Sequence, residues 1–271
     1  MNPQTSVVVT GAARGIGRSI AELLVRRGHR VVITDVNGAA VRRTADEIGA
    51  VAGLEQDVRD EASHRFVAEQ ALTHAPLAAW FNNAGVGHDG TLTDLSSDQV
   101  SNLVDVNLLG TLWGMRAALE AFGDRGGRAD GGGDIVNVAS LSGLGPVPGL
   151  SVYAATKAAV VSLTTSVNAE TSRKVRVHAV CPDGVATDMV EAMNPNGVAK
   201  ALVHSSGRLL TPEAVAAEAV ALLGTSRVLR TIPGWRGGLV RTTSLAPSLF
   251  QKALPVVRLM GRRGIRRQNV S

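Results

Sequence analysis

Tyr153 and Lys157 are the residues whose types and spacing most directly suggest chemistry. Tyr153 is the only tyrosine of the chain, and Lys157 is one of four lysines among 271 residues. On a helix, residues four positions apart share a face, so the ammonium of Lys157 would lie beside the phenol. A nearby cation favours the charged form of an acid, and we therefore expect the pKa of Tyr153 to fall below its usual value of about 10. The pair predicts a general acid and base that works near neutral pH.

A glycine-rich turn near the N-terminus is a candidate phosphate-binding site. The segment Thr10–Gly17 reads TGAARGIG and contains Gly11, Gly15 and Gly17. Such glycines permit a tight turn and a close approach of the backbone to a pyrophosphate, which the N–H groups of a following helix would bind. The spacing differs from the usual G-x-G-x-x-G pattern, so the turn predicts a dinucleotide only in combination with other residues.

Asp35 and Arg14 bear on which nicotinamide cofactor would bind. Asp35 ends a predicted strand, 18 residues after Gly17. A carboxylate at this position can accept hydrogen bonds from the ribose hydroxyls of the adenosine half, and it would repel the additional 2′-phosphate of NADP. Arg14 could instead hold that phosphate. We give Asp35 the greater weight and expect NAD, with NADP as the alternative.

These residues need a fold that brings them together. Short β-branched runs alternate with longer helical patterns, which is typical of βαβ units and a parallel sheet. The predicted strands are Ser6–Thr10, Arg30–Asp35, Gly53–Asp57, Ala78–Asn82, Asp134–Ala139, Val175–Cys181 and a last one near Gly238–Arg241. The predicted helices are Gly15–Arg27, Asn37–Ile48, Glu61–Thr73, Asp98–Phe122, Val152–Thr171 and Pro212–Leu223. We predict a single-domain, doubly wound parallel α/β sheet of the Rossmann type, with helices on both faces.

Further candidate groups follow the predicted strands, at the edge where ligands bind in such sheets. Ser140 follows the fifth strand, 13 residues before Tyr153, and Asn107 lies within the long helical stretch Asp98–Phe122. Taken separately, such a serine is usually a cap and such an asparagine makes a local hydrogen bond. The groups that follow the third and fourth strands are Asp57, Val58, Asn83, Ala84 and Gly85.

Together these motifs resemble the short-chain dehydrogenase/reductase family. The order TGxxxGIG, NNAG, asparagine, serine and YxxxK covers roughly residues 5–241. The resemblance implies that Tyr153 exchanges a proton with the substrate oxygen and that Ser140 hydrogen-bonds the same oxygen. Lys157 would lower the pKa of Tyr153 and hold the nicotinamide ribose, while Asn107 would hold a proton-relay water. The implied reaction is hydride transfer that interconverts a secondary alcohol and a ketone.

The resemblance also implies cofactor contacts and an assembly. The expected contacts are Gly11, Arg14, Gly15, Ile16, Gly17, Asp35, Asp57, Val58, Asn83, Ala84, Gly85, Tyr153, Lys157, Val185 and Thr187. The family usually has Pro-Gly after the sixth strand, whereas this chain has Pro182-Asp183-Gly184. If a positive φ is required at Asp183, aspartate tolerates it better than most residues but less well than glycine. A homodimer or homotetramer through the helices on either side of Ser140 is expected.

Composition bounds the class of protein. One cysteine, Cys181, excludes an internal disulfide and favours a reducing compartment. The N-terminus has no signal-peptide pattern, and no apolar stretch approaches the ~20 residues that span a bilayer. We therefore expect a cytoplasmic protein without a metal or a nucleic-acid partner. Residues 123–133 are glycine-rich and predict a surface loop, while residues 186–210 predict a long active-site lid.

The chain ends in a basic extension, predicted to comprise residues 242–271 after a dehydrogenase domain of residues 1–241. No acidic residue follows Glu218, so the ten basic residues after it leave the first 218 residues with a net charge of −5 against +5 for the whole chain. Pro247 and Pro255 are expected to break any long helix here. The apolar positions of the extension are Leu245, Leu249, Leu254, Val257 and Met260. The extension either contacts anionic membrane surfaces, is solvated, or packs on a neighbouring subunit.

The sequence thus predicts an NAD(H)-dependent oxidoreductase acting on a secondary alcohol or ketone. Met189, Met193, Val198 and Leu202 in the lid hint at an apolar substrate, although ordinary packing explains the same residues. Two alternatives are an NADPH-dependent ketoreductase and a catalytically silent nucleotide-binding regulator. An intact set of asparagine, serine, tyrosine and lysine speaks against the silent protein.

Overall fold

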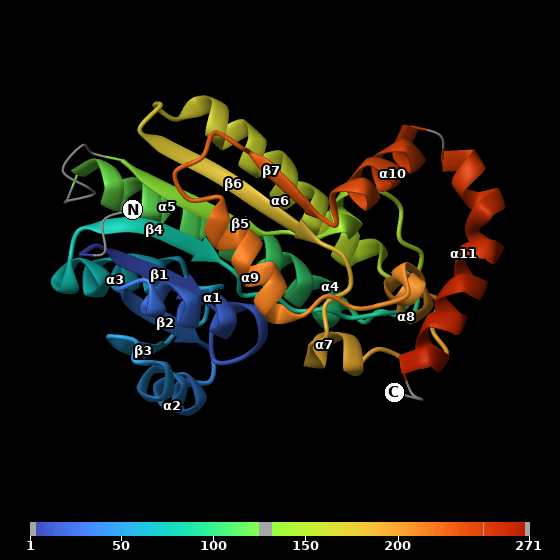
Figure 1. Ribbon diagram of the computed structural model, residues 1–271, viewed down its shortest axis with the longest axis horizontal. Coiled ribbons are helices and arrows are strands. Elements are labelled where there is room, and N and C mark those ends of the chain that lie inside the picture. Colours follow the sequence, from blue (N-terminus) through green and yellow to red (C-terminus); the bar gives the residue numbers. More distant parts are fainter. Residues whose placement is uncertain (1–3, 125–131, 246, 269–271) are drawn as a thin grey trace.

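A seven-stranded parallel sheet forms the centre of the computed structural model, which describes residues 4–124, 132–245 and 247–268 (Figure 1). The strands are β1 (Ser6–Thr10), β2 (Arg30–Asp35), β3 (Ala52–Glu55), β4 (Leu77–Asn82), β5 (Gly133–Val138), β6 (Val175–Pro182) and β7 (Leu229–Ile232). Their order in the sheet is β3-β2-β1-β4-β5-β6-β7, and all neighbours are parallel. The chain therefore winds outward from β1 in one direction and from β4 in the other. The predicted doubly wound sheet is confirmed.

Helices cover both faces of this sheet, which is why its strands are nearly continuous apolar runs. The helices are α1 (Gly15–Arg26), α2 (Gly38–Ile48), α3 (Glu61–His74), α4 (Ser97–Val104), α5 (Gly110–Asp124), α6 (Ser151–Glu170), α7 (Asp188–Glu191), α8 (Val198–Val203), α9 (Pro212–Ala221), α10 (Gly234–Leu245) and α11 (Pro247–Gln268). Successive strand residues point to opposite faces. In β1, Val7 and Val9 pack with residues of α1 and α9, whereas Val8 packs with residues of α3 and α5.

The predicted last strand near Gly238–Arg241 is wrong, because these residues lie within α10. The observed strand, β7, pairs with the end of β6, and Pro233 directly follows it. Proline has no N–H to continue a ladder. A Cβ on Gly237 would overlap the side chain of Thr231, so this glycine allows α10 to pack closely on β7 rather than marking a turn.

The long predicted helix Asp98–Phe122 is interrupted. Between α4 and α5 the segment Asp105–Leu109 forms a turn of π-helix, which contains Asn107. Such π-helical turns are rare in proteins, and those that occur often lie at functional sites. The predicted lid also has structure of its own, since it contains α7, α8 and the 3₁₀ turn His204–Ser206. Most of the predicted glycine-rich loop, residues 125–131, lies outside the described residues.

The C-terminal part of the chain is helical, and Pro255 lies inside α11 instead of ending it. The N–H that proline lacks would bind the carbonyl of Gln251, and both residues are exposed, so water can bind that carbonyl. Pro247 is the first residue of α11, a position where the missing N–H has no intrahelical partner in any case. α10 spans the predicted boundary at residue 241.

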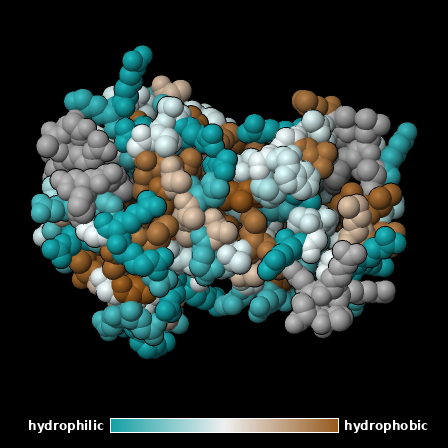
Figure 2. Space-filling view, viewed as in Figure 1, coloured by the Kyte–Doolittle hydropathy of each residue, from teal (hydrophilic) through white to brown (hydrophobic). Residues whose placement is uncertain are grey.

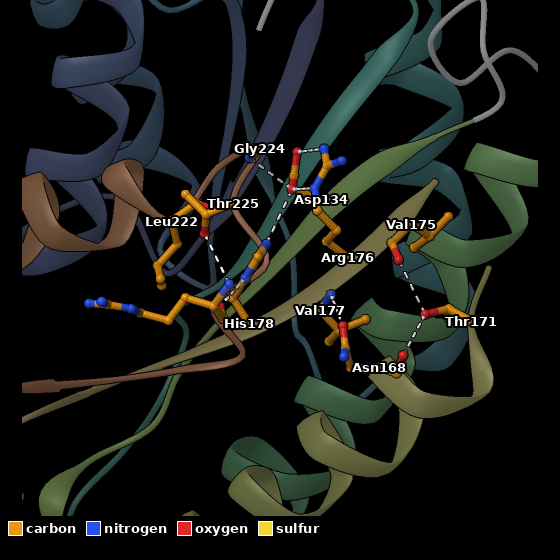
Figure 3. Close-up of polar contacts among 11 residues, drawn as sticks. Asp134, Asn168, Thr171, Val175, Arg176, Val177, His178, Leu222, Gly224 and Thr225 are labelled. Carbon is orange, nitrogen blue, oxygen red and sulfur yellow. Dashed lines mark hydrogen bonds and ion pairs between the residues drawn. The ribbon is translucent and has the colours of Figure 1, made fainter. Parts of the chain in front are cut away.

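At the amino ends of β5 and β6, a buried ion cluster ties three segments together (Figure 3). The carboxylate of Asp134 accepts two hydrogen bonds from Arg176, at 2.7 and 2.9 Å, and one from the backbone N–H of Gly224 at 3.1 Å. A ring nitrogen of His178 lies 3.2 Å from the same carboxylate, and the other lies 2.7 Å from the carbonyl of Arg227. The cluster thus joins β5, β6 and the loop before β7 at the edge opposite the carboxyl ends.

Candidate active site

A cavity of about 1320 Å³ lies at the carboxyl ends of the strands. Ligand pockets usually measure roughly 300–1,000 Å³, so this one has room for a dinucleotide and a second molecule. Of the predicted site residues, all except Gly17 and Asn107 line the cavity. Those that do are Gly11, Arg14, Gly15, Ile16, Asp35, Asp57, Val58, Asn83, Ala84, Gly85, Ser140, Tyr153, Lys157, Val185 and Thr187. The fold therefore brings both predicted ends of the site into one space.

The glycine turn after β1 is shaped for a close backbone approach. Gly11 has a φ of +62°, and a Cβ there would lie 2.6 Å from the Cα of Ala84. Gly17 does not line the cavity, but a Cβ there would overlap the carbonyl oxygen of Gly11. The packing of the turn therefore requires glycine at this position. The N-cap residue of α1, Arg14, makes no side-chain hydrogen bond to the first turn. The first N–H groups of α1 are thus left for a ligand, which fits the pyrophosphate of a dinucleotide.

Asp35 and Arg14 occupy different electrostatic settings. The carboxylate of Asp35 accepts hydrogen bonds from the backbone N–H groups of Ala13, at 3.2 Å, and Asn37, at 3.1 Å. These contacts hold it at the wall of the cavity beside the glycine turn. Arg14 forms an ion pair with Asp188 of α7, and both side chains are mostly exposed. The guanidinium that could favour NADP is therefore already engaged by a carboxylate.

Two predicted contact residues make their main interactions within the protein. The amide of Asn83 donates to the carbonyls of Thr10, at 2.9 Å, and Gly11, at 2.8 Å, and so holds the glycine turn in place. Both carboxylate oxygens of Asp57 accept hydrogen bonds from Arg59. The hydrogen bond from Arg59 lowers the pKa of Asp57 below its ordinary value.

Ser140, Tyr153 and Lys157 meet at the end of β5. Tyr153 and Lys157 lie in α6, and Nζ of Lys157 is 5.8 Å from the centre of the Tyr153 ring. This Nζ donates a hydrogen bond to the carbonyl of Val138 at 2.9 Å. Oγ of Ser140 accepts hydrogen bonds from the N–H and the hydroxyl of Ser142, at 3.1 and 2.8 Å. The helical spacing thus brings phenol, ammonium and serine hydroxyl to one wall of the cavity.

In the ligand-free protein the pKa of Tyr153 is raised, not lowered as the spacing of the pair predicts. Burial raises the pKa of Tyr153 to about 12, and the hydrogen bond with Ser140 offsets part of this increase. Burial also lowers the pKa of Lys157 to about 8. Lys157 is buried and Tyr153 is partly buried, so the charged form of both groups is disfavoured, and the ammonium is directed to the carbonyl of Val138. The sequence shows the spacing of the pair but not its desolvation.

Asn107 is buried behind the cavity wall rather than on it. Its side-chain oxygen accepts from the N–H of Val86 at 2.9 Å, and its amide donates to the carbonyl of the same residue at 3.0 Å. The amide also reaches Oγ1 of Thr156, in α6, at 3.3 Å. Through these contacts Asn107 links the segment after β4 to the helix that carries Tyr153 and Lys157.

Asp183, where the sequence departs from the family pattern, carries no backbone strain. The described non-glycine residues all have negative φ, so Asp183 does not adopt a left-handed conformation. Its carboxylate instead lies 2.6 Å from Nε of Arg236 of α10, inside the cavity wall. Burial raises the pKa of Asp183, and the charge of Arg236 opposes the shift. The sequence did not identify Arg236, because nothing distinguishes it from the other arginines that follow Glu218.

Comparisons with known proteins agree with this fold. The family model for short chain dehydrogenases matches residues 5–197. A sorbitol dehydrogenase from Cereibacter sphaeroides is 40% identical over 69% of this chain and 74% of its own length. The "Probable oxidoreductase EphD" of Mycobacterium tuberculosis is 33% identical over 83% of this chain, which spans only 43% of that protein. The chain belongs to the short-chain dehydrogenase family of oxidoreductases.

A solved structure supports the same assignment. The 3-ketoacyl-(acyl-carrier-protein) reductase from Brucella melitensis, complexed with NADH, superposes with a TM-score of 0.76 at 29% identity. The match covers 84% of this chain and 96% of the reductase. Within the described ranges, no helix is long and apolar enough to cross a membrane. The same part of the chain contains no group of three or more His, Cys, Asp or Glu side chains placed to hold a metal ion.

Proposed function

We propose that this protein is an NAD(H)-dependent oxidoreductase that interconverts a secondary alcohol and a ketone. One observation carries the proposal: a single cavity has the glycine turn and Asp35 at one end and Ser140, Tyr153 and Lys157 at the other. The structural neighbour with NADH supports the choice of cofactor. The sorbitol dehydrogenase relative supports a reaction at a CH–OH group.

The residues of the chain divide the work of this reaction. The glycine turn and the first N–H groups of α1 would bind the pyrophosphate, and Asp35 would bind the adenosine ribose. When bound, the oxidised nicotinamide ring supplies a hydride acceptor and a positive charge. Tyr153 removes the proton from the alcohol oxygen, or returns it to the ketone, while Ser140 hydrogen-bonds that oxygen. Lys157 keeps a cation close to the phenol, and Asn107 holds the segment after β4 against α6.

The high pKa of Tyr153 places a condition on this mechanism. A phenol with a pKa of about 12 is a poor base at neutral pH. A positive charge placed beside it favours the phenolate, and Lys157 with its pKa of about 8 is still charged at pH 7. We infer that the phenol becomes competent when the oxidised cofactor binds. Catalysis and cofactor binding would then be linked through the pKa of this one side chain.

Replacement of Tyr153 by Phe tests the proposal. The variant keeps the ring and loses only the hydroxyl, so we expect it to bind NAD as the wild type does and to show no turnover of any secondary alcohol. Nucleotide absorbance measures turnover, and calorimetric titration with NAD measures binding. Turnover that persists in the variant would refute Tyr153 as the acid and base. A wild type that binds NAD but converts no alcohol or ketone would favour the silent nucleotide-binding regulator.

The choice between NAD and NADP rests on Asp35 and Arg14. The carboxylate of Asp35 is held at the cavity wall, whereas Arg14 is paired with Asp188. The carboxylate of Asp35 favours NAD over the alternative of an NADPH-dependent ketoreductase, whereas the exposed pair of Arg14 and Asp188 is weak and leaves Arg14 able to bind a 2′-phosphate. Titration of the wild type with both cofactors decides the matter, and tighter binding of NADPH would overturn the choice.

The assembly and the location of the protein also stay proposals. We propose a homodimer or homotetramer formed through α5 and α6, and sedimentation velocity measures its size. Val256 and Leu259 of α11 are 61% and 52% exposed, and Arg262 and Arg263 are exposed on the same helix. Figure 2 shows hydrophobic and hydrophilic atoms side by side at the right, where Figure 1 places α11. This favours peripheral contact of a cytoplasmic enzyme with anionic lipid. Equal sedimentation of the wild type and the double variant Arg262→Glu, Arg263→Glu with anionic vesicles would exclude it.

A further inference from the structure

The two C-terminal helices form one side of the catalytic cavity. Trp235 and Leu239 of α10 and Val257 and Met260 of α11 line the same space as Tyr153. We call α10 and α11 the tail wall. The family model that matches the chain ends at residue 197, so these helices lie beyond the matched segment. The side chains that α11 contributes here are apolar, whereas α10 also contributes Arg236, Thr242 and Thr243.

The first helix of the tail wall is fastened to the segments on both sides of the catalytic residues. Oγ of Ser244 donates to the carbonyl of Leu144 at 2.7 Å, in the turn that follows Ser140. Arg236 pairs with Asp183 at the end of β6, and its Nη2 donates to Oγ of Ser205 at 2.6 Å. α10 is therefore held at the end of β5, at the end of β6 and at the lid.

The second helix of the tail wall packs directly on the lid. Gly261 and Gly264 of α11 are buried, and a Cβ on either would overlap the backbone carbonyl of Ala201 or of His204 respectively. The two glycines share one face of the helix and bring its backbone against α8 and the following 3₁₀ turn. This close contact turns Val257 toward the cavity, while its neighbour Val256 lies on the exposed side. The lid and α11 thus form one continuous wall.

Apolar side chains line the cavity from both α11 and the lid region. Met189 and Met193 of the lid region face the same space as Val257 and Met260, and methionine adapts to irregular apolar ligands. The charged groups at this end, Asp183 and Arg236, are paired with each other. A ligand here would bury its hydrocarbon chain against flexible apolar side chains and place its alcohol or carbonyl group at Ser140 and Tyr153.

We propose that the tail wall determines the substrate class, and that the substrate is a secondary alcohol or ketone with an extended apolar chain whose far end packs on Val257 and Met260. This inference rests on the proposed function for the position of the reacting carbon. Each buried methylene should raise affinity roughly fourfold. A chain long enough to reach α11 should therefore bind much more tightly than a short one.

The test compares 2-butanone and 2-decanone as ligands of the NAD-saturated enzyme. Oxidised cofactor cannot reduce a ketone, so calorimetry measures binding without turnover. The variant Val257→Asp places a charge in the tail wall. Val256→Asp is the matched control, because it puts the same charge on the same helix turn but outside the cavity. Denaturation temperature and NAD affinity check that each variant is folded, and Val257→Phe, which enlarges the side chain but keeps it apolar, serves as the second variant.

We expect Val257→Asp to weaken binding of 2-decanone by roughly tenfold or more, the effect of losing two or more buried methylenes, and to leave 2-butanone unchanged. Val256→Asp should change neither, and Val257→Phe, which keeps the tail wall apolar, should retain the preference for 2-decanone. Equal effects of the two aspartate variants, or no preference for 2-decanone in the wild type, would overturn the inference. Because the readout is binding, failure of turnover alone would count against the proposed reaction and not against the tail wall.

Discussion

Replacement of Asp134 by Asn should destabilise the protein in a manner that depends on pH. The carboxylate is fully buried and accepts hydrogen bonds from Arg176, His178 and Gly224. Burial opposes its ionisation, but the hydrogen bonds from His178, Arg176 and Gly224 outweigh burial and lower its pKa from 3.8 to about 2. That difference alone corresponds to roughly 2 kcal/mol of stability at neutral pH. The variant also removes the carboxylate that Arg176 contacts, and breaking a buried pair costs about 3–5 kcal/mol, with the lower end expected here because the Arg176 side chain is 22% exposed.

We therefore expect Asp134→Asn to lower the free energy of unfolding at pH 7 by about 3 kcal/mol, or the denaturation temperature by roughly 6–12 °C. Because the pKa is lower in the folded protein, the stabilisation is complete above the unfolded pKa of 3.8 and is lost as pH falls toward 2. Urea unfolding followed by circular dichroism, repeated between about pH 7 and pH 3, measures both effects. The difference in the free energy of unfolding between wild type and variant should decrease between about pH 4 and pH 3.

Glu218→Gln is the matched control for this experiment. Glu218 likewise accepts two hydrogen bonds from Arg230, at 2.7 and 2.8 Å, in a bidentate ion pair, but about a third of each side chain is exposed. Pairs in contact with water contribute about 0–1 kcal/mol, so the control should lose little. An equal loss in both variants, or a gap that does not change with pH, would refute the assignment of the energy to buried charge.

Three further predictions concern the cavity. Gly17→Ala should lower NAD affinity, measured by calorimetric titration, by roughly tenfold or more, because the added Cβ would overlap the carbonyl of Gly11 and displace the turn that binds phosphate. Gly238→Ala is the control, because Gly238 has open space around it, and it should leave NAD affinity unchanged. Asp35→Ser should shift the ratio of NADP to NAD affinity toward NADP, and an unchanged ratio would mean that this carboxylate does not set the preference. Lys157→Met should raise the free energy of unfolding at pH 7 by on the order of 2 kcal/mol while abolishing turnover. The pKa of Lys157 falls from 10.5 to about 8 on folding, so at pH 7 the folded protein carries the full cost of burying this charge. That cost disappears only as the pH rises from about 8 to 10.5, and the variant does not carry it at any pH. A variant that is no more stable than the wild type at pH 7 would contradict the third prediction.

The sequence predicted the sheet well because its strands are distinctive. Runs such as Val7–Val9 are buried on both faces, and few other structures place three adjacent valines away from water. The last strand was misplaced because β7 has only four residues, of which three are partly exposed. Gly237, directly before the predicted strand, allows close packing of α10 on Thr231.

The sequence also predicted which residues gather in the cavity, since glycines and polar side chains at the carboxyl ends of parallel strands converge in space. It could not predict their protonation. The raised pKa of Tyr153 comes from the residues packed around the site, and spacing along one helix carries no information about that burial. The contribution of Val257 was equally hidden, because Pro247 and Pro255 argued against the continuous helix that presents it.

The pKa of Tyr153 with and without oxidised cofactor tests the account most directly. Tyr153 is the only tyrosine, so the near-ultraviolet absorbance of phenolate reports this residue alone. The ligand-free protein should show almost no phenolate up to about pH 10, because burial raises the pKa to about 12. Saturation with NAD should bring ionisation into the range below about pH 10, where a general base can act. A phenol that stays un-ionised to the same pH in the complex would contradict the proposed mechanism.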